Sequence, residues 1–188
     1  MTEDQAFTPS PIRSFFGFSA RMIVVQFLTY FLFGLFTYSV GIHVFAYYEA
    51  NPDPLVTAFH RPSTSPLVMA GPLFQLVRAV IFALALYPFR RVFLERRWGW
   101  VYLWGLFLAL AIFAPSGEQP GSIEGYVYTN LPVLFHLLYL PEIVLQTLLF
   151  SWLVVFWEGH KVKKLITIPL VVVFFAILIM SILGVLMG

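Results

Sequence analysis

The sequence contains no cysteine and few charged residues, and each of these absences narrows the chemistry that the chain can perform. Without cysteine it has no disulfide, no thiolate metal ligand and no cysteine nucleophile. Charged residues make up 11% of the chain, whereas a soluble domain has about 25%. Hydrophobic residues make up 60% of the 188 residues and the mean hydropathy is +0.87, so we interpret the chain as an integral membrane protein.

Motifs that mark common enzyme classes are also missing. The sequence has no GxSxG, Walker A or GxGxxG motif, so we predict no serine hydrolase or nucleotide-binding enzyme and assign no catalytic residue. The net charge is +2, but the basic residues flank apolar runs, so we expect no nucleic-acid partner. Residues 1–20 lack a basic region that leads into a short apolar stretch, and we expect no secretory signal there.

Five apolar segments are long enough to cross about 30 Å of hydrocarbon as helices. They are residues 22–48, 67–89, 98–114, 131–157 and 165–187. Backbone groups in lipid must be paired within a helix or a closed barrel, and continuous apolar runs are not barrel strands. We therefore predict an all-α bundle of five transmembrane helices that forms a single domain over residues 1–188.

The basic residues predict the orientation of this bundle. With the N-terminus in the cytoplasm, nine of the eleven Lys and Arg residues lie inside, while Arg61 lies outside and Arg78 lies in the membrane. The nine are Arg13, Arg21, Arg90, Arg91, Arg96, Arg97, Lys161, Lys163 and Lys164. We predict a cytoplasmic N-terminus and an outer C-terminus, in a bacterial-type inner (plasma) membrane. The outer connection over residues 49–66 contains four prolines and is expected to be extended rather than helical.

Arg78 and Glu142 each lie in the middle of a long apolar run. A charge at this depth is costly unless it has a partner or a water-filled cavity, so it indicates a functional site. Each residue is eleven positions from the outer end of its predicted span, at Leu67 and Leu131. At about 1.5 Å per residue, both lie about 17 Å deep. Equal depth predicts a bidentate ion pair between the second and fourth spans.

Three polar residues share helix faces with this predicted pair. Gln75 is one turn before Arg78, and Tyr139 and Gln146 flank Glu142 at minus three and plus four. We therefore predict a polar cavity lined by these five residues and by two histidines, His43 and His136. The alternative is a structural pair that fixes how two helices dock.

Two histidines form a second candidate site. His43 and His136 each lie five positions inside the outer end of a predicted span, about 8 Å deep. Equal depth on two helices fits axial ligation of a b-type haem, a proton relay, or two histidines that are simply hydrogen-bonded. The loop residues that could bind a metal ion have no recognised ligand spacing, so we predict no metal site from them. They are Glu49, Asp53, His60, Glu118 and Glu124.

Three functions fit these patterns. The first is a small transport or channel-like protein whose cavity handles protons or a small polar or anionic solute. The second is a non-catalytic accessory or structural subunit of a larger membrane complex. The third is a membrane redox protein that binds haem b through His43 and His136. Besides the lipid bilayer, we expect a second copy of the chain or a partner subunit, because a bundle of this size has little interior.

Overall fold

The computed structural model describes residues 11–62, 65–113, 117–159 and 164–187. Over these residues the protein is all-α, with no β-strand. The helices are α1 (Pro11–Ala50), α2 (Pro54–Phe59), α3 (Pro66–Met69), α4 (Gly71–Leu86), the 3-10 helix η1 (Tyr87–Phe89), α5 (Arg90–Leu94), α6 (Gly99–Ile112), α7 (Ile123–Tyr128), α8 (Val133–Gly159) and α9 (Lys164–Met187). Lys161, Lys163 and Ala114, which belong to the predicted basic cluster and third span, lie outside the described residues.

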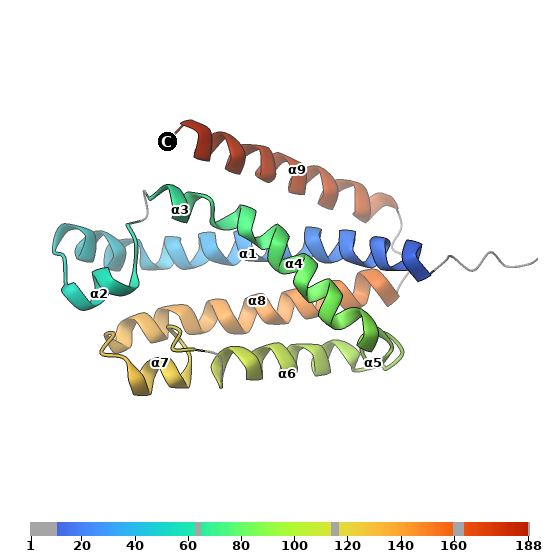
Figure 1. Cartoon of the computed structure of the whole chain (residues 1–188), viewed down its shortest axis with the longest axis horizontal. Coiled ribbons are helices and arrows are strands. Elements are labelled where there is room, and N and C mark those ends of the chain that lie inside the picture. Colours follow the sequence, from blue (N-terminus) through green and yellow to red (C-terminus); the bar gives the residue numbers. More distant parts are fainter. Residues whose placement is uncertain (1–10, 63–64, 114–116, 160–163, 188) are drawn as a thin grey trace, which may run out of the picture.

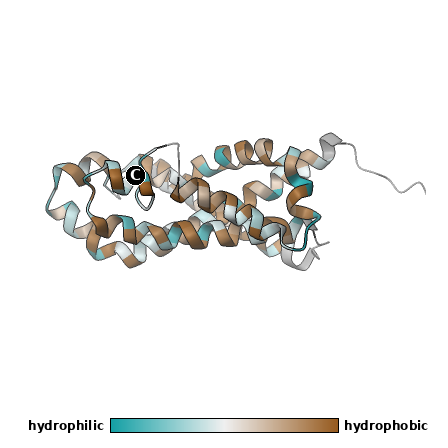
Figure 2. Ribbon diagram, turned by 90° about the horizontal axis from the view of Figure 1, so that it is seen from below, coloured by the Kyte–Doolittle hydropathy of each residue, from teal (hydrophilic) through white to brown (hydrophobic). Residues whose placement is uncertain are grey.

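Four helical segments are long and apolar enough to cross a membrane, as expected of an integral membrane protein. They are Ser14–Ala50, Gly71–Leu94, Val133–Glu158 and Thr167–Leu186. These helical segments overlap four of the predicted spans, and α8 and α9 begin and end within two residues of the predicted bounds. The helix in the third predicted span, α6, has 14 residues and is about 21 Å long. Hydrophobic residues extend over most of the long helices (Figure 2).

The long helix α1 lies at the centre of the bundle. It packs along α4 on one side and α8 on the other, while α6 packs along α8 and α9 lies against α1 and α4 (Figure 1). We call the end of the bundle that carries α2 and α7 the α2 end, and the end that carries α5 the α5 end. The start of α1 lies at the α5 end, and the end of α9 lies toward the α2 end (Figure 1).

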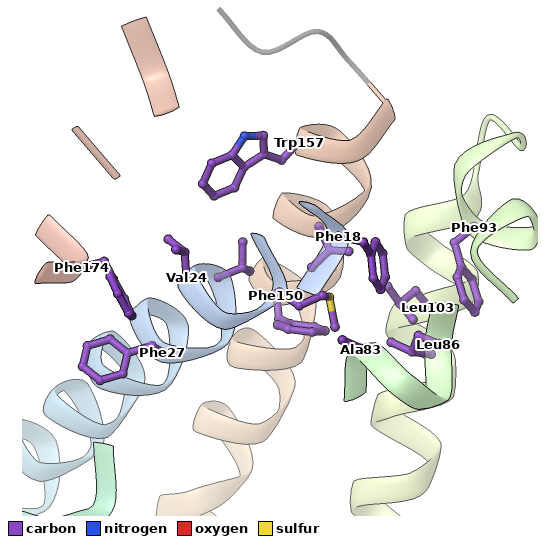
Figure 3. Packing of buried hydrophobic residues seen from close by; sticks show 13 residues of the cluster. Phe18, Val24, Phe27, Ala83, Leu86, Phe93, Leu103, Phe150, Trp157 and Phe174 are labelled. Carbon is purple, nitrogen blue, oxygen red and sulfur yellow. The ribbon is translucent and has the colours of Figure 1, made fainter. Parts of the chain in front are cut away.

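Aromatic side chains fill the α5 end. Phe18 and Phe27 of α1 are buried together with residues of α4, α5, α6, α8 and α9 (Figure 3). Phe27 meets Phe174 with ring centroids 5.0 Å apart, and Phe107 meets Phe150 at 5.2 Å, both edge to face. Lipid is as apolar as these side chains, so close packing rather than a hydrophobic driving force joins the helices here.

The connection between α1 and α4 is more helical than the sequence predicted. Residues 49–66 were expected to be extended, but they contain α2. Asp53 caps this helix, because its Oδ1 accepts a hydrogen bond from the backbone N–H of Leu55 at 2.8 Å. Pro54 occupies the first helical turn, where a missing N–H does no harm. The prolines therefore start helices in this segment instead of preventing them.

The predicted second span is interrupted near its beginning. Residues 67–89 were expected to form one helix, but α3 ends at Met69 and α4 begins at Gly71. Pro72 has no backbone N–H to donate to the carbonyl of Val68, so the helix cannot continue unbroken through this position. The depth predicted for Arg78 was counted along one continuous helix from Leu67, so it does not apply to α4.

The turn between α5 and α6 leaves no room for a side chain at Gly99. A Cβ atom there would lie 1.7 Å from the carbonyl oxygen of Phe93. We predict that Gly99→Ala destabilises the protein by about 1–3 kcal/mol, because the backbone must move. Thermal unfolding in detergent measures this loss. The control is Gly105→Ala in the same helix, where a Cβ meets no atom within 4 Å. Equal melting temperatures for the two variants would contradict the close approach of α5 and α6.

Candidate functional site

The predicted ion pair between Arg78 and Glu142 is wrong. Among the described residues, the ion pairs join Arg21 to Glu158 and Arg91 to Glu95. Arg78 is exposed on α4, whereas Glu142 is half-buried on α8. The ion pair between transmembrane helices therefore lies at the α5 end, where Arg21 Nε donates to Glu158 Oε1.

Two features of the fold separate Arg78 from Glu142. Near the α5 end, α4 and α8 meet through Phe82 and Phe150, whose ring centroids are 6.2 Å apart. Arg78 is four residues before Phe82 on α4, which places it about 6 Å from this contact toward the α2 end. Glu142 is eight residues before Phe150 on α8, which places it about 12 Å from the contact in the same direction. The two residues are thus out of register, and both helices pack along α1.

Gln75 joins two helices instead of lining a cavity. Gln26 Nε2 on α1 donates a hydrogen bond of 3.0 Å to Gln75 Oε1 on α4, and both side chains are 4% exposed. A buried polar group in lipid needs such a partner. The bond therefore fixes the register of α1 on α4. Gln146 is half-buried on α8 and is not among the described residues that line the cavity.

A cavity of about 1230 Å³ lies toward the α2 end, and we call it the Glu142 cavity. Residues of α1, α2, α3, α8 and the segment that follows α2 line it. The polar ones among them are Tyr30, Thr37, Tyr38, Tyr48, Glu49, Thr57, His60, Arg61, Tyr139 and Glu142. Its lining runs from Tyr30 to Tyr48, about 27 Å along α1. Of the seven residues predicted to line one cavity, Tyr139 and Glu142 line it.

The innermost part of the Glu142 cavity brings two phenols and a carboxyl group together. Tyr30 on α1 is within electrostatic range of Glu142 and of Arg78, and Tyr139 on α8 is within range of Glu142 and of Tyr30. The Thr37 hydroxyl interacts with the Glu142 carboxyl group, but its buried Oγ1 atom makes no hydrogen bond of ordinary geometry among the described residues. A buried unpaired hydroxyl is costly, so this chamber suits water or a polar ligand.

His60 forms part of the wall toward the α2 end. Its ring stacks on Phe135 with centroids 5.0 Å apart, and on Tyr139 at 5.7 Å with an interplanar angle of 7°. Its Nε2 atom is buried and has no hydrogen-bond partner in the described part of the chain. Removal from water lowers the pKa of His60 below the usual 6.5, so the ring is neutral near pH 7.

The two other candidate histidines lie in different surroundings. His43 is exposed on α1, whereas His136 is 6% exposed on α8, and neither lines the Glu142 cavity. His136 Nδ1 accepts a hydrogen bond of 3.1 Å from the backbone N–H of Gly121. Gly121 has a φ of +87°, a conformation that favours glycine. His136 therefore holds the loop before α7 against α8, and the structure offers no shared haem pocket for this pair among its described residues.

The loop residues considered as metal ligands are also not gathered. Among the residues that the structure describes, no group of three His, Asp or Glu side chains is placed to hold a metal ion. Asp53 instead caps α2, and His60 stacks on α8.

Sequence reasoning missed Tyr30 and Thr37, although a pattern marks them. With Gly34 they form an i, i+4, i+7 stripe on the first span, and Phe135, Tyr139 and Glu142 repeat that spacing on the fourth. No family model, curated protein or solved structure matches the chain.

We predict that acid loosens the packing of α2 on α8 through His60. Because the pKa of His60 is lower in the folded than in the unfolded protein, the unfolded state binds the proton first. The contribution of neutral His60 to the stability of the folded protein is complete above about pH 6.5. It is lost as the pH falls toward the pKa of His60 in the folded protein. Hydrogen exchange over residues 54–62, corrected for intrinsic rates, should be faster at pH 5.5 than at pH 7.5. His60→Gln should abolish the difference and His43→Gln, at an exposed site, should retain it; the opposite pattern would refute this account.

Proposed function

We propose that the protein is a small transport or channel-like membrane protein in which the Glu142 cavity handles protons or a small polar solute. The observation that supports this is the meeting of a carboxyl group with two buried, unpaired polar atoms, Thr37 Oγ1 and His60 Nε2, in one cavity. An anionic solute was also predicted, but that idea depended on Arg78 in the cavity. Arg78 is not among the lining residues, so the proposal omits anions.

The proposed topology has five spans with the N-terminus inside, in a bacterial-type inner (plasma) membrane. In its favour, α5 carries Arg90 and Arg91 at the end of the bundle where α1 begins (Figure 1). The short helix α6 lies along α8, and a helix shorter than the hydrocarbon can be accommodated by local thinning of the bilayer. In this topology the α2 end faces outward, and the Glu142 cavity opens on that side.

A second candidate function is an accessory subunit of a larger membrane complex or of a homo-oligomer. One observation favours it: Arg78 is exposed in the middle of α4. A guanidinium that faces lipid at this depth is costly, and a carboxylate from another chain would remove that cost. In this account Arg78 is a contact between subunits, and the Glu142 cavity has no transport role.

We predict that Glu142→Gln reduces transport to the level of protein-free liposomes, because the amide can neither ionise nor carry a proton. The measurement is proton uptake into proteoliposomes with an enclosed pH-sensitive dye, together with swelling in glycerol. The matched control is Glu95→Gln, which removes an exposed carboxyl group outside the cavity. Flux through Glu142→Gln equal to that of the unaltered protein would refute the proposal.

We further predict that Arg78→Leu dissociates any complex between chains that is held together by this guanidinium. In the native membrane, mild solubilisation and native gel electrophoresis should show a smaller complex for Arg78→Leu than for the unaltered chain. Arg91→Leu, another exposed arginine, should leave the complex unchanged. Identical migration of the Arg78 variant and the unaltered protein would remove the support for the second function.

A further inference from the structure

The Glu142 cavity combines a polar floor with aromatic walls. At its floor lie the carboxyl group of Glu142 and the hydroxyl of Thr37, which is 3% exposed and unpaired. Aromatic rings of α1 and α8 surround this floor and continue toward the α2 end. They include Tyr30, Tyr38, Phe45, Tyr48, Phe135 and Tyr139. Ring faces attract cations through their quadrupole, and they also pack on hydrocarbon.

The charges of the cavity favour a cation at this floor. Glu142 is the carboxyl group at the floor, while Glu49 near the end of α1 and the exposed Arg61 after α2 line the cavity toward the α2 end. His60 carries no charge near neutral pH, because burial lowers its pKa. Arg78 is within electrostatic range of Tyr30 but does not line the cavity. An ionised Glu142 would repel an anion, whereas it would attract a cation, as would the faces of the surrounding rings.

We propose that the Glu142 cavity binds hydrophobic organic cations, with a protonated amine held between Glu142 and Thr37. The inference rests on the proposed function and specifies the class of its solute. The ammonium N–H groups donate hydrogen bonds to the Glu142 carboxylate and to Thr37 Oγ1. Tyr30 and Tyr139 lie beside the bound charge, and the hydrocarbon part of the ligand packs along Phe135 toward the α2 end.

Each feature of the cavity has a use in this binding mode. The hydroxyl of Thr37, which makes no hydrogen bond of ordinary geometry among the described residues, gains one from the ammonium group. The volume of about 1230 Å³ accommodates a ligand of several rings, and Gly34 leaves space beside the floor because a Cβ there would meet no atom within 4 Å. Selectivity then comes from the charge at the floor, while the aromatic walls tolerate different hydrocarbon shapes.

Three probes of nearly the same shape test the inference. They are 3-phenylpropylamine, a cation at pH 7, the uncharged 3-phenylpropanol, and the anion 3-phenylpropanoate. Isothermal titration into the full chain in nanodiscs, with empty nanodiscs as the reference, should show the amine binding roughly tenfold or more tightly than the alcohol. The anion should bind more weakly still. Glu142→Gln should abolish the preference for the amine, Thr37→Val should weaken amine binding several-fold, and Glu95→Gln should change neither.

The outcomes separate this inference from the proposed function. Equal binding of the amine and the alcohol, or an unchanged amine preference in Glu142→Gln, would overturn the cation site. Transport that depends on Glu142 without a preference for the amine would leave the proposed function standing and refute the inference. Selective amine binding without transport by the unaltered protein would support the site and refute the transport function. Circular dichroism of each variant verifies that the helices remain folded.

Discussion

The packing of α1 between α4 and α8 is the constraint on which the rest of the structure depends. Lipid offers no hydrophobic driving force for helix association, so close contacts and buried polar bonds must hold these helices together. Met22, Val25 and Phe27 of α1 are almost completely buried in those contacts. The hydrogen bond from Gln26 to Gln75 fixes α4 at one register, and the ion pair of Arg21 with Glu158 joins α1 to α8.

This arrangement also explains why the two ends of the bundle differ. At the α5 end, aromatic residues from several helices meet around α1 and fill the space between them (Figure 3). Toward the α2 end, the helix break at Gly71 and the oblique course of α4 leave α1 and α8 to line a cavity with α2 (Figure 1). The same central helix produces a packed end and a hollow end.

The long helices could be predicted from the sequence because an apolar run of sufficient length has few alternatives in lipid. The ion pair could not, because depth alone does not determine which way a side chain points. Counting from Leu67 ignored the helix break before α4, and nothing in the spacing indicated that α4 and α8 both pack along α1. A stronger signal was the repeated i, i+4, i+7 stripe that contains Tyr30 and Thr37, since a shared face is what two packed helices require.

Glu142 without an arginine partner has a consequence for how a transporter of this kind would operate. An ionised carboxylate at this depth is costly, and either a proton or a bound ammonium group removes the cost. In the proposed binding mode the proton and the ammonium group both bind to the carboxylate oxygens of Glu142. Binding of the cation therefore requires release of the proton. The packed aromatic core at the α5 end closes the continuation of the cavity, which favours exchange with conformational change over an open pore. The movement would have to occur where α1 meets α4 and α8, because those contacts separate the cavity from the other side.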